Sequence, residues 1–115
     1  MIIKIENLRV RTIVGIFEWE KEVKQDIVIN IDITFDATKA IEKDSIDETI
    51  DYKSLNKKII TLIENKSFNL IERIAGDAMN LVMEDDRVLE ATVRVDKPGA
   101  LRFTDNVSVV HTKKR

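Results

Sequence analysis

The clearest pattern in the chain is a period-two alternation of apolar and polar residues. From residue 27 to residue 35 every second position is isoleucine or phenylalanine, and the positions between them are valine, asparagine, aspartate and threonine. Successive side chains of a strand point to opposite faces, so this pattern predicts a strand with one buried face. A similar alternation from Leu8 to Val14 predicts that the first ~14 residues form another strand, with a bulge near Asn7.

In the middle of the chain the apolar period becomes that of a helix. Apolar residues between positions 55 and 63 fall on one helical stripe, and Asp51 precedes them as an N-cap, which predicts a helix of about 14 residues. A second stripe covers residues 71–81, with Asn69 as the expected N-cap and Glu72 three positions further on. We expect these two helices to pack antiparallel to each other.

Strand alternation returns at residues 89–95, ends at Lys97-Pro98-Gly99 and resumes at residues 107–111. The order is therefore ββααββ within a single domain of residues 1–115. It predicts an α+β fold, in which two helices cover one face of an antiparallel four-stranded sheet. The last three residues, Lys113–Arg115, are expected to form a solvated end.

The second face of the predicted sheet is polar. Alternation alone favours its exposure to water, because antiparallel sheets commonly have one wet face. The face could also line a channel or contact a partner. It would carry Arg9, Arg11, Asn30, Asp32, Thr34, Thr92 and Arg94.

Composition excludes several kinds of function. Nineteen basic and 21 acidic residues give a net charge of -2, which disfavours nucleic acid and anionic lipid as partners. The absence of cysteine excludes disulfides, and the single histidine, His111, excludes multi-histidine metal sites. Charges at Lys4 and Arg9 are unlike a signal peptide or a membrane span, so we expect a soluble cytoplasmic protein.

Four residues at the ends of predicted elements could carry chemistry. Lys97 ends a strand and is restricted to extended conformations by Pro98. Glu72 lies in the first turn of a helix, where a carboxylate stays ionised and can accept two hydrogen bonds from an amidine-like edge. Tyr52 opens the other helix, and Glu20 lies in the long loop after the first strand. Each has an ordinary structural alternative: a solvent-reaching lysine, a capping-box glutamate, a packed tyrosine and a solvated loop glutamate.

Four segments in this order and spacing resemble the dihydroneopterin aldolase family of folate biosynthesis, including its dihydroneopterin triphosphate 2'-epimerase branch. The resemblance extends over nearly the whole chain. It implies the tunnelling fold, in which ββααββ subunits join into rings and two stacked tetramer rings form a homo-octamer with active sites between subunits. The segments are Asn7–Gln25, Ile46–Leu55, Phe68–Ala75 and Val93–Val109.

The resemblance also implies roles for the four candidates. Glu72 matches the glutamate that binds the 2-amino and N3 edge of the pterin, assisted by the backbone of the preceding residue, Ile71. Lys97 matches the lysine that donates and accepts protons, and Glu20 the loop glutamate near the substrate side chain. Tyr52 matches the tyrosine that a neighbouring subunit brings to the site. No metal or cofactor is implied, because the dihydropterin is its own electron sink.

The branch of the family is the open point. Val14 precedes Gly15 where many members have a histidine, Lys97–Ala100 resembles the aldolases, and Asn7–Ile16 and Ala100–Asp105 resemble the epimerase. We expect an aldolase that also epimerises. The alternatives are a triphosphate 2'-epimerase, for which Arg102 could bind phosphate or simply be solvated, and a non-catalytic oligomer that binds pterin or purine.

Overall fold

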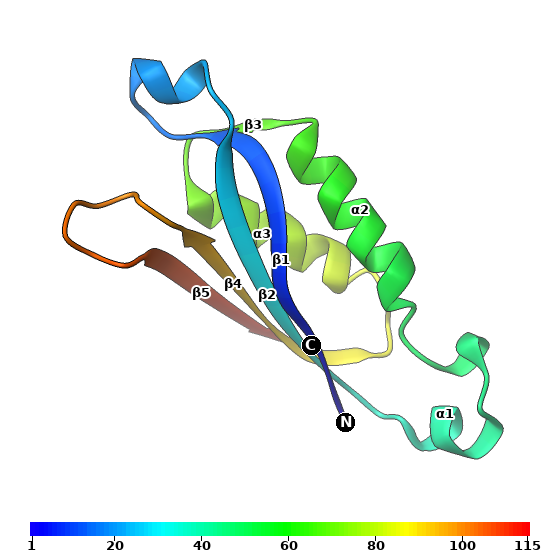
Figure 1. Cartoon of the computed structure of the whole chain (residues 1–115). Helices are drawn as coiled ribbons and strands as arrows, with labels where there is room; N and C mark the ends of the chain where they lie inside the picture. The colour runs from blue at the N-terminus through cyan, green and yellow to red at the C-terminus, as the bar shows by residue number, and fades with distance from the viewer.

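The computed structural model describes residues 1–115 as a curled sheet with helices against one face (Figure 1). The sheet order is β3-β1-β2-β4-β5, and all pairs are antiparallel except β3 with β1. The elements are β1 Ile2–Val14, the 3-10 helix η1 Glu18–Lys21, β2 Gln25–Phe35, α1 Thr38–Lys43, the 3-10 helix η2 Ile46–Glu48, α2 Tyr52–Glu64, β3 Ser67–Phe68, α3 Ile71–Val82, β4 Val88–Lys97 and β5 Val107–Lys114.

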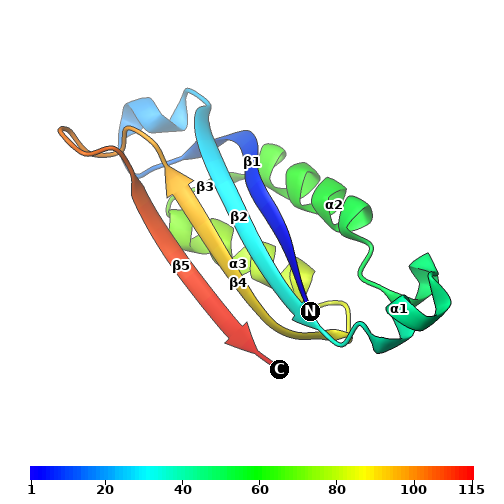
Figure 2. The ribbon, with the colours of Figure 1, turned by 60° about the horizontal axis from the view of Figure 1, so that its bottom comes forward.

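The predicted α+β arrangement is confirmed. β1, β2, β4 and β5 are the four long strands, and α2 and α3 lie on the same side of them (Figure 2). The sheet differs from the prediction by one short strand, β3, which pairs Ser67 and Phe68 with the end of β1. Two residues are too few for periodicity to reveal a strand. None of the helices is both long and apolar enough to cross a membrane.

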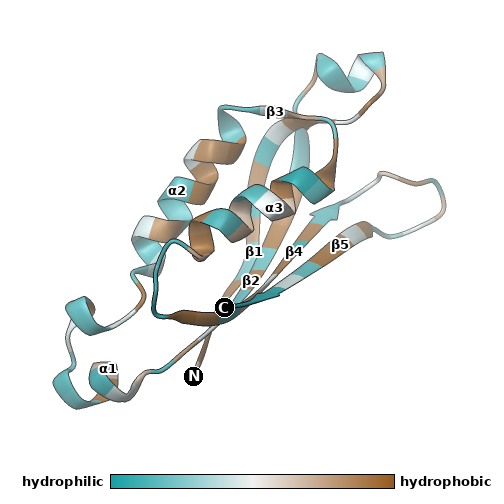
Figure 3. Cartoon of the chain, turned by 180° about the vertical axis from the view of Figure 1, so that it is seen from behind, coloured by the Kyte–Doolittle hydropathy of each residue, from teal (hydrophilic) through white to brown (hydrophobic).

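The core lies between the sheet and the two helices. Alternate residues of β2 from Ile27 to Ile33 have no exposed surface, and Ile59, Ile63 and Ile74 of the helices are equally inaccessible. Apolar and polar residues alternate along both helices, as the spacing of their buried positions requires (Figure 3). Burial of these side chains is the main stabilisation that holds the helices on the sheet.

The predicted bulge in β1 is present. Ile5 pairs with Ile31 and Leu8 with Ile29, so two residues of β1 oppose one residue of β2. Asn7 adopts the left-handed conformation with φ 53°, and its N–H donates to Oδ1 of Asn30 over 2.9 Å. The extra residue keeps apolar side chains on the core face both before and after the bulge.

The helix starts were only partly predicted. Asp51 caps α2 as expected, since its Oδ1 accepts from the Ser54 N–H over 3.0 Å. The expected N-cap Asn69 is wrong: α3 begins at Ile71, its N-cap is Leu70, and no side chain caps it. Pairing of the adjacent Ser67 and Phe68 with β1 fixes the chain up to this turn, so the helix begins one residue late. Glu72 is therefore not part of a capping box.

The C-terminal end is also more ordered than predicted. β5 extends to Lys114, and Arg115 donates from Nε to the Val88 carbonyl and from Nη2 to the Met83 carbonyl, both over 2.7 Å. These carbonyls lie around the turn between α3 and β4 and need donors. Lys113–Arg115 are exposed, as expected of a solvated end, but hydrogen bonds from the Arg115 side chain hold its last residue in place.

The polar face of the sheet carries ion pairs between neighbouring strands and within them. Lys4 and Asp32 approach to 3.1 Å, Arg11 and Asp26 to 3.2 Å. Within β4, Nε of Arg94 lies 2.8 Å from Oδ1 of Asp96. In the single chain most of these side chains remain half-exposed, so each pair contributes about 1 kcal/mol or less to stability.

Candidate active site

A short ion pair joins two residues that are far apart in sequence. Lys97, at the end of β4, places its Nζ 2.6 Å from Oε2 of Glu20 in η1, and the two residues are 77 positions apart. Their side chains are only 13% and 6% exposed, respectively. Pro98 follows Lys97 and restricts its backbone to the extended form that continues the strand. Buried charges require such partners, so each residue holds the other in place.

The Glu20 carboxylate has further partners. Oε1 accepts from the Phe17 N–H over 3.3 Å, and Oε2 accepts from Nε2 of Gln25 over 3.2 Å. The hydrogen bond from Lys97 lowers the pKa of Glu20 below its ordinary value and outweighs burial, which alone would raise it. The carboxylate is therefore ionised and fixed.

Gly15 leaves the space that this carboxylate occupies. Its φ of 143° lies in a region that side chains rarely adopt, and a Cβ at this position would overlap the carboxylate of Glu20. The Gly15 N–H donates to the Phe68 carbonyl over 3.1 Å, which ties the loop to β3. The glycine thus allows the loop after β1 to close over the end of β4.

An open cavity of about 370 Å³ lies beside the Glu20–Lys97 pair. Its walls come from the loop after β1, the start of α3, and the facing ends of β4 and β5. Ionisable groups are present at Glu20, Lys97 and Glu72, and most of the remaining wall is apolar. The lining residues are Val14, Gly15, Ile16, Phe17, Glu20, Asn69, Leu70, Ile71, Glu72, Lys97, Val107 and Val109.

Four of the five residues singled out from the sequence thus meet at one cavity: Glu20, Lys97, Ile71 and Glu72. Glu72 is in the first turn of α3, where unpaired N–H groups favour a carboxylate. Apolar walls with a carboxylate on α3 and a paired ammonium on β4 suit a flat heterocycle that presents an amidine edge and has a reactive side chain.

Tyr52 does not reach this cavity in its own chain. It is the first residue of α2, at the end of the helix remote from β3 (Figure 1), and it is 54% exposed. It lines a different recess of about 490 Å³, together with residues of β1. Within one chain the structure therefore separates Tyr52 from the other candidates.

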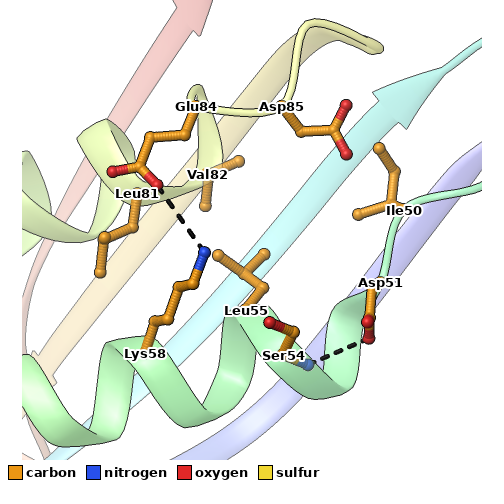
Figure 4. A pocket seen from close by; sticks show the side chains of 9 residues that line it. All are labelled: Ile50, Asp51, Ser54, Leu55, Lys58, Leu81, Val82, Glu84 and Asp85. Atoms are coloured by element: carbon orange, nitrogen blue, oxygen red, sulfur yellow. Dashed lines mark hydrogen bonds and ion pairs between the residues drawn. The ribbon is translucent and has the colours of Figure 1, made fainter.

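A small cavity between α2 and the end of α3 has a structural explanation. It measures about 120 Å³ and is lined by three carboxylates, at Asp51, Glu84 and Asp85 (Figure 4). Asp51 caps α2, and Oε2 of Glu84 lies 4.0 Å from Nζ of Lys58. Asp85 accepts hydrogen bonds from Arg87. Its carboxylates therefore already serve the local structure.

Sequence reasoning missed some of the lining. Val107 and Val109 follow the strand period and could have been placed on the inner face of β5. Gln25 could not, because nothing in the sequence indicates that its amide contacts Glu20 and also donates to the Val14 carbonyl, over 2.9 Å.

Comparison with known proteins identifies the relatives of the chain. The family profile of FolB, dihydroneopterin aldolase, matches residues 3–112. A dihydroneopterin triphosphate 2'-epimerase of Escherichia coli is 42% identical over 108 residues, which are 94% of this chain and 90% of that protein. The dihydroneopterin aldolase of Escherichia coli is 28% identical over 109 residues, 95% of this chain and 89% of that protein.

Solved structures of dihydroneopterin aldolases superpose closely on this chain. A crystal structure described as a dihydroneopterin aldolase from Vibrio cholerae superposes with a TM-score of 0.94 at 30% identity, covering 100% of this chain and 98% of that one. The Escherichia coli dihydroneopterin aldolase in complex with neopterin superposes with a TM-score of 0.92 at 27% identity, covering 98% of both chains.

Proposed function

This chain belongs to the dihydroneopterin aldolase family, and we propose that it cleaves the side chain of a 7,8-dihydroneopterin in a retro-aldol step. The observation that carries the proposal is the buried contact of 2.6 Å between Lys97 and Glu20 beside an open cavity. It provides a positioned proton carrier where the reacting side chain would lie.

Glu72 is proposed to bind the pterin ring. Its carboxylate lies at the start of α3 and would accept hydrogen bonds from the 2-amino group and N3, while the backbone of Ile71 assists. Hydrogen bonds to a charged acceptor are roughly twice as strong as neutral ones, so this edge would fix the orientation of the ring. The side chain at C6 would then extend toward Lys97 and Glu20.

The reaction needs only positioning and proton transfer from the protein. The 2'-hydroxyl loses its proton, the C1'–C2' bond breaks, and the electron pair moves into the C6=N5 imine as N5 takes up a proton. Glycolaldehyde leaves, and protonation of the resulting enamine at C1', with loss of the N5 proton, restores the C6=N5 bond and gives 6-hydroxymethyl-7,8-dihydropterin. In this scheme Lys97 carries protons, and Glu20 holds its ammonium in place.

Epimerisation is the second candidate. If the aldehyde turns over and adds back to the enamine, the 2' centre is inverted and nothing is released. The observation that supports this outcome is the 42% identity to proteins named dihydroneopterin triphosphate 2'-epimerase, compared with 28% to an aldolase. Both outcomes use the same bond cleavage and the same residues.

Assembly completes the proposed site. We expect a homo-octamer of two stacked tetramer rings, in which Tyr52 of one subunit reaches the cavity of its neighbour. The placement of Tyr52 outside the cavity of its own chain supports this arrangement. So does the exposure of apolar residues at the mouth of that cavity, where Phe17 is 62% and Leu70 50% exposed.

A paired-substrate assay tests the proposed function. Purified protein is incubated with 7,8-dihydroneopterin and with its triphosphate, and aldehyde release and 2' inversion are followed. We expect turnover of at least one substrate, and Lys97→Ala should lower kcat by about 100-fold or more while pterin binding is largely retained.

Lys57→Ala, at an exposed position of α2 that is remote from the cavity, is the matched control and should leave kcat unchanged. Absence of turnover with both substrates would contradict the enzyme proposal. If a pterin or purine still bound, and Lys97→Ala changed nothing, the non-catalytic oligomer would be the better description.

A further inference from the structure

The recess beside Tyr52 has an unusual charge. It lies between the bulged part of β1 and the first turn of α2, and measures about 490 Å³. Three cations line it, Lys4, Arg9 and Lys53, against the single carboxylate of Glu6. The whole chain carries a net charge of -2, so this local excess of positive charge runs against the overall balance.

Two of these cations are not neutralised within the chain. Lys4 makes an ion pair of 3.1 Å with Asp32. Arg9 on β1 and Lys53 on α2 form no ion pair and no side-chain hydrogen bond in the structure, whereas Arg11, two residues after Arg9, pairs with Asp26. Unpaired cations in a recess attract anions, and a guanidinium can bind phosphate oxygens through two parallel hydrogen bonds.

The β1 bulge positions these groups. Because Glu6 and Asn7 together oppose Asn30, β1 bends there, and Arg9 is on the polar face immediately after the bend.

On α2, Asn56 lies one turn after Tyr52 and has a buried Oδ1 without a hydrogen-bond partner. Such acceptors are rare in folded proteins, and a hydroxyl of a ligand would satisfy this one.

The catalytic cavity has the opposite charge. Glu20 and Glu72 outnumber Lys97 among its ionisable lining groups. A ligand with several phosphate charges would be repelled there, whereas the pterin ring is uncharged. A substrate that carries both a pterin ring and several phosphates would therefore need two regions of different charge. This chain has them in two places, the catalytic cavity and the recess beside Tyr52.

We infer that the Tyr52 recess is the triphosphate subsite of the composite active site, and that Arg9 and Lys53 recognise the phosphates. The inference rests on the proposed function, because Tyr52 must face the cavity of a neighbouring subunit. The triphosphate is esterified to the terminal oxygen of the substrate side chain, so the aldehyde formed by C1'–C2' cleavage carries it. A recess that holds the triphosphate also retains this aldehyde for re-addition, which favours 2' inversion over release.

The test compares selectivity between two substrates. The variant Arg9→Gln/Lys53→Gln is assayed with dihydroneopterin triphosphate and with dihydroneopterin. We expect the ratio of the two kcat/KM values to fall at least about tenfold, mainly through a higher KM for the triphosphate. A larger fraction of the turned-over triphosphate should appear as free aldehyde. Binding of inorganic tripolyphosphate to the wild type, measured by calorimetry, should weaken with added salt and in the variant.

Lys57→Gln is the matched control, since it removes the same charge one turn further along α2 and lies outside the recess. It should leave the selectivity ratio unchanged. Lys53→Gln alone, at an exposed helix position, is included in case the double variant misfolds, and thermal melting shows whether both variants are folded.

An unchanged selectivity ratio in both variants, with an active wild type, would overturn the subsite. A loss confined to Arg102→Gln would assign phosphate recognition to the β4–β5 loop instead. A wild type that is inactive with both substrates would overturn the proposed function, while tripolyphosphate binding would still report on the recess.

Discussion

At the scale of single residues, the position of the Glu20 side chain depends on a residue without a side chain. Gly15 has both a backbone conformation and a spatial environment that exclude a Cβ, because the Glu20 carboxylate occupies that space. Glu20 in turn holds Lys97 through the 2.6 Å contact. A substitution at Gly15 is therefore expected to displace Glu20 and, through Glu20, the proposed proton carrier Lys97.

Gly15→Ala tests this dependence. We expect a loss of about 1–3 kcal/mol in the free energy of unfolding, from strain at φ 143° and from displacement of Glu20. Turnover should fall as well, because Lys97 loses its fixed partner. Gly76→Ala is the matched control: apart from its chain neighbours and the backbone of its own helix, no atom lies within 4 Å of the new Cβ, and alanine in a helix should stabilise by about 0.5–1 kcal/mol. Equal effects of the two substitutions in chemical denaturation would contradict this account.

The sequence could identify the candidate residues but not their surroundings. Lys97 and Glu72 stood out because Pro98 and a helix start restrict them, and those restrictions are local. The burial of Glu20 was not predictable, because it arises from Lys97 in a strand 77 residues away. The residues around Glu20 in the sequence would look the same if its side chain were exposed to solvent, so they do not reveal its burial.

At the scale of elements, an ion cluster connects the first two turns of α3 to the chain before β3. Asp77 lies 3.0 Å from Nζ of Lys66, which immediately precedes β3, and 2.9 Å from Nε of Arg73. Burial opposes ionisation of Asp77, yet the hydrogen bonds from Lys66 and Arg73 lower its pKa below the ordinary value. The cluster thus ties the chain that enters β3 to the helix that carries Glu72.

We expect Asp77→Asn to lower the free energy of unfolding at neutral pH by about 1 kcal/mol, a modest value because Lys66 and Arg73 are largely exposed. A carboxyl whose pKa is lowered on folding stabilises the protein above its unfolded pKa, and this stabilisation is lost as the pH falls through the lower folded value. The difference between wild type and variant in urea denaturation should therefore begin to shrink as the pH falls to about 3.8, the ordinary pKa of the group, and disappear below the lower folded pKa. Asp86→Asn, at a fully exposed position, is the control. A difference that is independent of pH would contradict the electrostatic explanation.

The long elements were predicted from the sequence, and the short ones were not. The strands and helices of eight or more residues have enough apolar positions for a period to emerge, and all six were found. The short elements η1, α1, η2 and β3 have two to six residues each and depend on tertiary contacts. The same contacts moved the start of α3 away from Asn69, which local preference favours as a cap.

At the scale of the whole molecule, the proposed site is divided between two separate recesses of one subunit. Glu20, Lys97 and Glu72 line one cavity and Tyr52 lines another. The sequence indicated the polar second face of the sheet and the fold class, since both follow from alternation. It could not indicate from spacing which residues would meet, because only three-dimensional placement decides that.

Subunit mixing tests the division. Lys97→Ala and Tyr52→Phe are each expected to lower turnover when pure. If each active site takes Lys97 from one subunit and Tyr52 from the next, random co-assembly of equal amounts should restore roughly a quarter of the wild-type sites. Light scattering should show the octamer in both variants. A monomer at micromolar concentration, or no recovery after co-refolding, would contradict the shared site.

The bulge at Asn7 has a consequence for how this subunit can change over evolutionary time. It adds one residue to β1 between two stretches whose apolar side chains both face the core. Removing a single codon there would give an uninterrupted strand with the same inward-facing residues, and would leave the core unaltered. The cationic recess next to the bulge could thus be gained or lost independently of foldability, by one small insertion or deletion.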